Sequence, residues 1–318
     1  MMYKLKGLAV AALCVLSFTA CHKEPQEASH EDNSASEQWE RYMYVDHTDT
    51  VYNNAVGRDV FCKYLRDYGF TGVYLYSTRE ILSDVSNYAA FGDFMERLDA
   101  YGVKHRAVAA ASAFSFQTGG RVANFNASQL SAKRRVNRAN LEREWWNGDG
   151  SWEEWIDANR QIANATIADN DFYIGWYRNL GSTIDTVAAA AQASSSDRIL
   201  LHCYQKVIPS YNYANAQSEG ATCGRLDIIA KGARDAGKRI DLYIIISAED
   251  TLWGAENQFS GPLLAAAAVQ PNPYRYIEAQ AYENIHSAMT DFQRQWIDLK
   301  GFVWFTKRYC YQAVPPSL

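Results

Sequence analysis

The chain has 318 residues, of which 48% are hydrophobic and 21% are charged. It is therefore long enough for one large core and too apolar to be disordered. The formal net charge is −5, and the most basic run is the short segment Lys133-Arg134-Arg135. Because phosphate binding needs a concentrated basic surface, the composition argues against a nucleic-acid partner. Aromatic residues make up 14% of the chain, which is typical of ligand sites and of cores alike.

Residues 1–20 have the features of an export signal. Lys4 and Lys6 precede an apolar stretch over residues 7–18, which is too short to span a membrane. The sequence LSFTAC at residues 16–21 resembles a bacterial lipobox, and the resemblance implies cleavage before Cys21 and lipid attachment to its sulfur. The alternative is a plain secretory signal with an incidental cysteine. We expect a lipoprotein of the cell envelope that is attached to the membrane through Cys21.

Residues 21–39 are polar and lack apolar periodicity, which predicts a disordered tether. From residue 40 onward, short runs rich in Val, Ile, Tyr and Phe alternate with segments of helical periodicity. The predicted strands are 41–47, 72–77, 105–112, 136–144, 172–178, 198–205, 240–249 and 301–307. The predicted helices are 58–68, 91–101, 152–168, 183–193, 226–236 and 279–299. Gly69, Gly102 and Gly237 are expected to end three of these helices.

Eight apolar strands alternating with helices predict an α/β fold, a single (β/α)8 TIM barrel over residues 40–318. The first strand is not followed by a G-x-G-x-x-G turn, so a dinucleotide-binding fold is not expected. In such barrels, active sites lie at the carboxyl ends of the strands. The predicted strand ends carry acids, aromatic residues and a histidine, without the spacing of a metal site. We expect no cofactor and no metal.

The fourth predicted strand carries the strongest candidate site. Side chains alternate along a strand, so Asn140, Glu142 and Glu144 share one face. Two carboxyl groups on one face repel each other, and one of them is expected to stay protonated near neutral pH. An acid beside a carboxylate is the pairing that glycoside cleavage uses. The alternative is a pair of salt-bridged surface acids beside Arg138 and Arg143.

The segment Asn137-x-x-Asn140-x-Glu142-x-Glu144 resembles the fourth-strand signature D-x-x-D-x-D-x-E of glycoside hydrolase family 18, the chitinases and endo-β-N-acetylglucosaminidases. The spacing is the same, and Glu144 is the identical residue. The third-strand motif S-x-G-G of that family is replaced by Ala110-Ala111-Ser112-Ala113. Family members also carry a Tyr at the end of the sixth strand, where Tyr204 stands, and a Trp in the eighth, where Trp304 stands.

The resemblance implies a catalytic set of three residues. Glu144 would be the general acid, Glu142 would orient the acetamide group of the substrate, and Tyr204 would hydrogen-bond that group. The acetamide oxygen would be the nucleophile, with retention of configuration. Asn140 would line the site, and Trp304 would form the floor under the sugar.

Further candidates at strand ends have alternative interpretations. Trp146 and Trp176 are candidates for sugar stacking, and core packing is the other interpretation for both. Asp46 lines the site or caps the first loop. Glu249 ends the seventh strand, where another clan of retaining glycosidases places its nucleophile. His202 fits a core histidine better than a base.

We expect a surface lipoprotein that acts on N-acetylglucosamine-containing glycans, as part of a Bacteroidota-like envelope. The alternatives are a non-catalytic glycan-binding lipoprotein with a degenerate site and a structural envelope protein with a vestigial pocket. Protein partners and the oligomeric state are left open. Export makes disulfides possible, but the sequence leaves open any pairing among Cys62, Cys203, Cys223 and Cys310.

Overall fold

A computed structural model describes residues 39–111, 115–142, 150–164, 169–174, 182–203, 224–249 and 262–317. Within these ranges, eight strands follow one another along the chain with helices between them. They are β1 (Glu40–Val45), β2 (Gly72–Leu75), β3 (His105–Ala111), β4 (Arg138–Glu142), β5 (Asp169–Ile174), β6 (Arg198–His202), β7 (Ile240–Ser247) and β8 (Ile297–Phe305).

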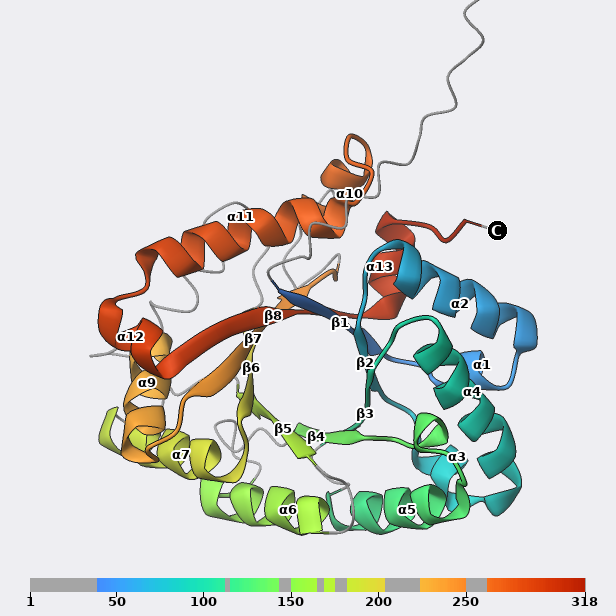
Figure 1. Ribbon diagram of the computed structural model, residues 1–318, viewed down its shortest axis with the longest axis horizontal. Coiled ribbons are helices and arrows are strands. Elements are labelled where there is room, and N and C mark those ends of the chain that lie inside the picture. The colour runs from blue at the N-terminus through green and yellow to red at the C-terminus, as the bar shows by residue number, and fades with distance from the viewer. Residues whose placement is uncertain are drawn as a thin grey trace, which may run out of the picture. The chain divides into compact units, whose positions relative to one another are not determined.

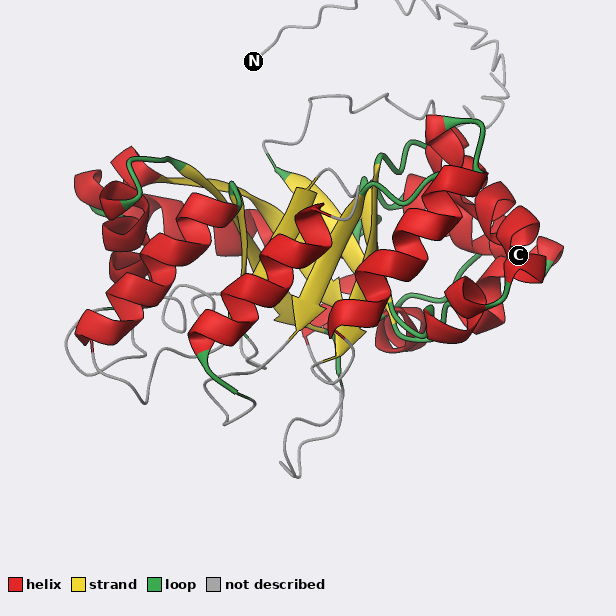
Figure 2. Cartoon of the chain, turned by 90° about the horizontal axis from the view of Figure 1, so that it is seen from below, coloured by secondary structure: helices red, strands yellow, loops and turns green. Residues whose placement is uncertain are grey.

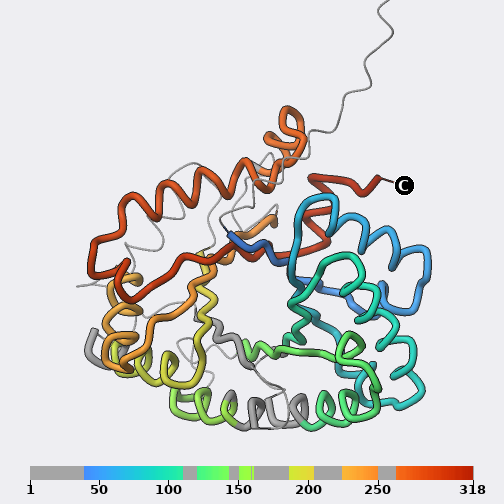
Figure 3. Tube along the Cα trace, in the orientation of Figure 1, coloured from blue at the N-terminus to red at the C-terminus, as the bar shows by residue number. Residues whose placement is uncertain are grey.

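Each strand pairs in parallel with the next, and β8 pairs with β1, so the sheet closes into a barrel. Figure 3 shows this closure, with β1 in blue beside β8 in red. The α/β class and the parallel, curled sheet predicted from the sequence are confirmed. The leader and the tether predicted over residues 1–39 lie outside the described residues, apart from Trp39.

The helices surround this ring of strands (Figures 1 and 2). In the first half of the chain they are α1 (Asp49–Tyr52), α2 (Ala55–Asp67), α3 (Arg79–Ser83), α4 (Tyr88–Ala100) and α5 (Ser115–Ser128), with 3-10 turns η1 (Val85–Asn87) and η3 (Ala132–Arg134). In the second half they are α6 (Trp152–Asn164), α7 (Ser182–Ser195), α9 (Arg225–Asp235), α10 (Pro262–Ala267), α11 (Pro273–Ala288), α12 (Asp291–Trp296) and α13 (Lys307–Ala313). None of the helices in the described ranges is long and apolar enough to cross a bilayer.

The helix predicted over residues 279–299 is wrong in its second half. The structure has α11, then α12, and β8 already begins at Ile297. The break is made by a capping box, in which the Thr290 hydroxyl accepts from the Gln293 backbone and the Gln293 side chain accepts from the Thr290 backbone. Predicted stops elsewhere are confirmed. Gly69, Gly102 and Gly237 follow α2, α4 and α9 with positive φ angles of 72°, 89° and 64°.

The two faces of each strand have different neighbours. On β1 the rings of Tyr42 and Tyr44 point into the barrel, where both contact the ring of Tyr74 from β2. The alternate residue Arg41 points outward and reaches Glu278 of α11, with both side chains fully buried. The barrel lumen is therefore lined by tyrosines, whereas the layer between strands and helices encloses a buried ion pair.

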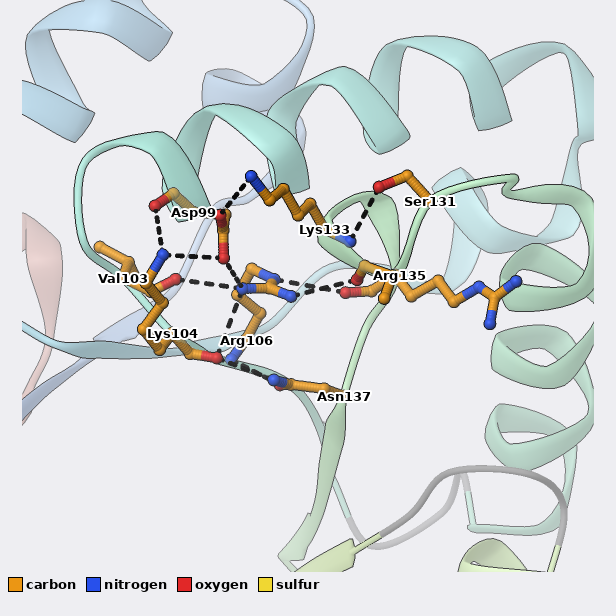
Figure 4. A network of polar contacts seen from close by, with 9 residues as sticks. Asp99, Val103, Lys104, Arg106, Ser131, Lys133, Arg135 and Asn137 are labelled. Carbon is orange, nitrogen blue, oxygen red and sulfur yellow. Dashed lines mark hydrogen bonds and ion pairs between the residues drawn. The ribbon is translucent and has the colours of Figure 1, made fainter.

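The amino ends of β3 and β4 are tied together by a polar network (Figure 4). The Arg106 side chain is only 5% exposed, and its guanidinium lies 3.1 Å from Asp99; the Lys104 ammonium lies at the same distance from that carboxylate. The Asn137 side chain accepts from the Arg106 backbone at 2.8 Å and donates to the Lys104 carbonyl at 2.8 Å. The charged side chains of Asp99, Lys104 and Arg106 at this end of the strands thus pair with one another and hold the fold together.

Candidate functional site

The carboxyl end of β4 projects its polar face into the barrel. Asn140 is buried, with 1% of its surface exposed, and its Oδ1 accepts from the Tyr44 hydroxyl of β1 at 3.4 Å. The half-buried Glu142 accepts a hydrogen bond at Oε2 from the hydroxyl of Tyr76, which directly follows β2. Both partners belong to strands on the other side of β3. The side chains of residues 140 and 142 therefore lie in the lumen and not among the helices.

Two phenol groups surround the Glu142 carboxylate. The rings of Tyr44 and Tyr76 stack with centroids 5.4 Å apart. Burial raises the pKa of Tyr44 well above its usual value, and the nearby Glu142 carboxylate raises it further. Tyr44 thus remains a neutral hydrogen-bond donor at any physiological pH. The arrangement offers a carboxylate, an amide and phenols, which are the groups that recognise hydroxyls and amides of a polar ligand.

The lumen at this level is further lined from β3 and β8. The β3 residues Ala107 and Ala109 are buried, and Ala109 is paired in register with Asn140. The ring of Phe305, at the end of β8, meets the ring of Tyr44 edge-on with centroids 5.5 Å apart. Small side chains on β3 and an aromatic ring on β8 therefore lie on either side of the tyrosines.

The structure places Trp304 outside the lumen. Its indole nitrogen donates to Glu278 Oε1 on α11 at 2.6 Å, and its ring packs edge-on against Tyr274 of the same helix. Only 1% of the residue is exposed. Trp304 thus faces the helices, and the prediction that it forms a floor under a sugar is wrong. Its neighbour Phe305 occupies the lumen face.

The other described candidates lie at strand ends. The Ser247 hydroxyl donates to Glu249 Oε2 at 3.1 Å, and the Glu249 backbone donates to that hydroxyl at 3.1 Å, so the acid is folded back onto the end of β7. The Asp46 carbonyl accepts from the Ser77 hydroxyl at 3.0 Å and ties β1 to β2. Burial lowers the pKa of Lys307 on α13, and the charges of Asp46 and Asp49 oppose that shift.

His202 ends β6 on the lumen face. It shares that face with Arg198, whose guanidinium donates to the Tyr42 hydroxyl at 2.8 Å from across the barrel. Burial lowers the pKa of His202 to about 3, and the neighbouring Arg225 lowers it further. The ring is therefore neutral and a weak base at neutral pH, which fits a core histidine better than a general base.

No family model matches this chain, and no curated protein matches it. Among solved structures, the chain is similar to a GH18 chitinase from Pseudoalteromonas aurantia, with a TM-score of 0.45 and 8% sequence identity. The similarity covers 86% of this chain and 96% of that one.

Several predicted site residues fall outside the described residues. They are Glu144, Trp146, Trp176, Tyr204 and Cys21. The predictions for these residues therefore stay predictions, and so does the expectation that one acid of the pair at 142 and 144 remains protonated.

Among the described residues close to Asn140 and Glu142, the sequence analysis missed Tyr44, Tyr76 and Phe305. A signal for the tyrosines is present, because Tyr42 and Tyr44 alternate on one strand as Tyr74 and Tyr76 do on the next. Alternation of this kind assigns all four rings to one face once the outer face is known.

The described cysteines are buried free thiols, namely Cys62, Cys203 and Cys310, while Cys223 lies outside the described residues. Burial raises the pKa of Cys62 to about 12, so its thiol stays protonated. In the part of the chain that the structure describes, no three His, Cys, Asp or Glu residues are grouped to hold a metal ion.

Proposed function

We propose that this protein binds N-acetylglucosamine-containing glycans at the carboxyl end of its barrel and hydrolyses them. The observation that carries the proposal is the direction of Asn140 and Glu142, which point together into a lumen lined by the phenols of Tyr44 and Tyr76. Polar groups stacked in a barrel interior are costly unless a structural or ligand role requires them. Glu144 is two residues further on, so alternation assigns it to the same face if the strand continues.

In the proposed reaction, Glu144 protonates the glycosidic oxygen of the leaving sugar. The acetamide oxygen of the substrate attacks the anomeric carbon, the bond to the leaving oxygen breaks, and a cyclic oxazolinium ion forms. Glu142 orients the acetamide and stabilises the positive charge that develops on it. Water, deprotonated by Glu144, then opens the ring with net retention. Phe305, rather than Trp304, supplies the aromatic contact from β8.

The experiment is turnover by the full-length chain of chitooligosaccharides and high-mannose N-glycans, with products separated by chromatography and identified by mass. Glu144→Gln is expected to abolish product release, since the amide cannot donate the proton. Glu153→Gln, which alters an exposed acid on α6, is the matched control and is expected to keep full activity. A wild-type protein that neither cleaves nor binds any of these glycans would overturn the proposal.

A second candidate function is glycan binding without hydrolysis. It is favoured by the third strand, where Ala110-Ala111-Ser112-Ala113 replaces the S-x-G-G motif of the resembled family, and by the altered fourth-strand motif. Binding of chitotetraose that survives Glu144→Gln, with no product from wild type, would select this function. In either case we propose that lipid on Cys21 holds the barrel at the cell envelope; mass spectrometry of the mature amino terminus tests this part.

A further inference from the structure

The phenol of Tyr76 reaches a strand that is not its neighbour. Tyr76 follows β2, its hydroxyl donates to Glu142 at the end of β4, and β3 lies between the two strands. Adjacent strands are about 4.8 Å apart, so the two side chains that this hydrogen bond joins come from backbones about 10 Å apart along the sheet. A side chain that crosses a whole strand does so only where the strand between leaves room.

The inward residues of β3 leave that room. His105 of β3 faces the lumen, where its ring stacks on Tyr42, so the alternate residues Ala107 and Ala109 face the lumen too. Ala107 is paired in register with Tyr74, and Ala109 with Asn140. Both alanines are buried, with 0% and 4% exposure. These two methyl groups form an alanine track, a part of the inner face of β3 that fills little space and over which the ring of Tyr76 extends toward β4.

The ring of Tyr76 is held in this direction by Tyr44. The two rings stack at an interplanar angle of 28°, and Tyr44 is itself fully buried and bonded to Asn140. Stacking on a fixed ring removes the freedom of Tyr76 to turn away, so its hydroxyl points at Glu142 Oε2 before any ligand arrives. Such pre-organisation is the condition under which a carboxylate acts on a substrate with little rearrangement.

We infer that Tyr76 is a positioning residue, which fixes the Glu142 carboxylate across the alanine track of β3 so that it meets the acetamide group of the glycan. The inference rests on the proposed function, because it assigns Glu142 a ligand. A hydrogen bond to an ionised carboxylate also favours the ionised form. Tyr76 therefore acts on both the direction and the charge of Glu142.

The test compares Tyr76→Phe with Tyr88→Phe in the full-length protein. Tyr88 is a buried tyrosine outside the lumen whose hydroxyl donates to the Leu82 carbonyl at 3.2 Å, so its variant also loses one phenol hydrogen bond. With chitotetraose as substrate, Tyr76→Phe is expected to lower kcat about tenfold with little change in KM, and to move the acidic limb of the kcat/KM profile up by about one pH unit. Tyr88→Phe is expected to leave both unchanged.

Equal kcat and equal pH profiles in the two variants would overturn the inference and leave the proposed function standing. A wild-type protein that neither cleaves nor binds chitotetraose would overturn the proposed function, and the inference with it. If wild type binds without cleaving, the comparison moves to Kd: a severalfold larger Kd for Tyr76→Phe alone supports the inference, and equal values overturn it.

A second variant tests whether the small side chains of the alanine track are needed for Tyr76 to reach Glu142. Ala109→Leu keeps the Tyr76 hydroxyl but fills the space over β3, and it is expected to reproduce the pH shift of Tyr76→Phe. An Ala109→Leu protein that folds, as judged by circular dichroism, and keeps the wild-type pH profile would contradict the inference.

Discussion

Glu278 and Glu142 are two carboxylates on opposite sides of the same barrel wall. Glu278 lies in the layer between strands and helices, where the Arg41 guanidinium and the indoles of Trp39 and Trp304 all donate to it. Burial raises the pKa of Glu278, and the charge of Arg41 together with the hydrogen bonds from Arg41, Trp304 and Trp39 opposes that shift. Glu142 is the last residue of β4, lies on the lumen face, is half-buried and has the phenols of Tyr76 and Tyr44 beside it.

The difference separates a structural acid from a candidate functional acid. A carboxylate enclosed by a guanidinium and two indoles has its acceptor capacity used within the fold, and it has no surface left for a ligand. A carboxyl group that accepts from a phenol and keeps part of its surface exposed remains within reach of a ligand.

The largest effect is expected from removing the enclosed acid. Glu278→Ala leaves Arg41 charged, buried and without its partner, so the free energy of unfolding should fall by about 3–5 kcal/mol in urea titrations followed by circular dichroism. Asp67→Ala removes the partner of Arg66 in an exposed pair 2.7 Å apart and should cost less than about 1 kcal/mol. Similar losses for the two variants would contradict this view of Glu278.

Trp304 and Phe305 distinguish the two faces of β8. Trp304→Phe deletes the indole donor to Glu278, and a loss of about 1–3 kcal/mol in unfolding free energy is expected with no change in chitotetraose affinity. Phe305→Leu, on the lumen face, should weaken chitotetraose binding in calorimetry. Weaker binding by the Trp304 variant instead would show that the faces have been assigned the wrong way round.

Because the pKa of the lumen residue His202 is lowered in the fold, the protein is expected to lose stability in acid. The pKa of His202 is about 3 in the fold and about 6.5 when unfolded, so the unfolded chain binds more protons between these values. Stability is full above pH 6.5 and falls as pH drops toward 3, by at most about 1.4 kcal/mol per pH unit. In urea titrations at several pH values, His202→Asn should flatten this dependence, whereas His286→Asn on the exposed side of α11 should not.

The smallest effect is expected at the amino ends of the strands. Asp99→Asn removes the charge that faces Arg106 and Lys104 in the network of Figure 4 and should lower the unfolding free energy by about 1 kcal/mol. The loss should shrink at high salt because the Lys104 side chain is exposed. Glycan binding at the carboxyl ends should not change, and a change there would link the two ends of the barrel.

The sequence predicted the polar face of β4 correctly for a simple reason. Strand parity over residues 140–142 involves no bulge, so counting by two assigns Asn140 and Glu142 to one side. The expectation for Trp304 came instead from its match to a Trp in the eighth strand of the resembled family, and the strand register decides otherwise. Trp304 pairs with Met43, which alternates with the lumen residues Tyr42 and Tyr44. Trp304 therefore faces the helices, and its neighbour Phe305 faces the lumen.

What the sequence determined by itself is the alternation of strands and helices, the glycine stops, and the pairing of an amide and an acid on one side of β4. These features depend on backbone periodicity and on residue types within a few positions of each other. Only the tertiary structure decided that β1 meets β8, that Arg41 meets Glu278, and that Tyr76 reaches Glu142 over two alanines. Contacts between residues dozens to hundreds of positions apart arise from closure of the barrel, which no local pattern encodes.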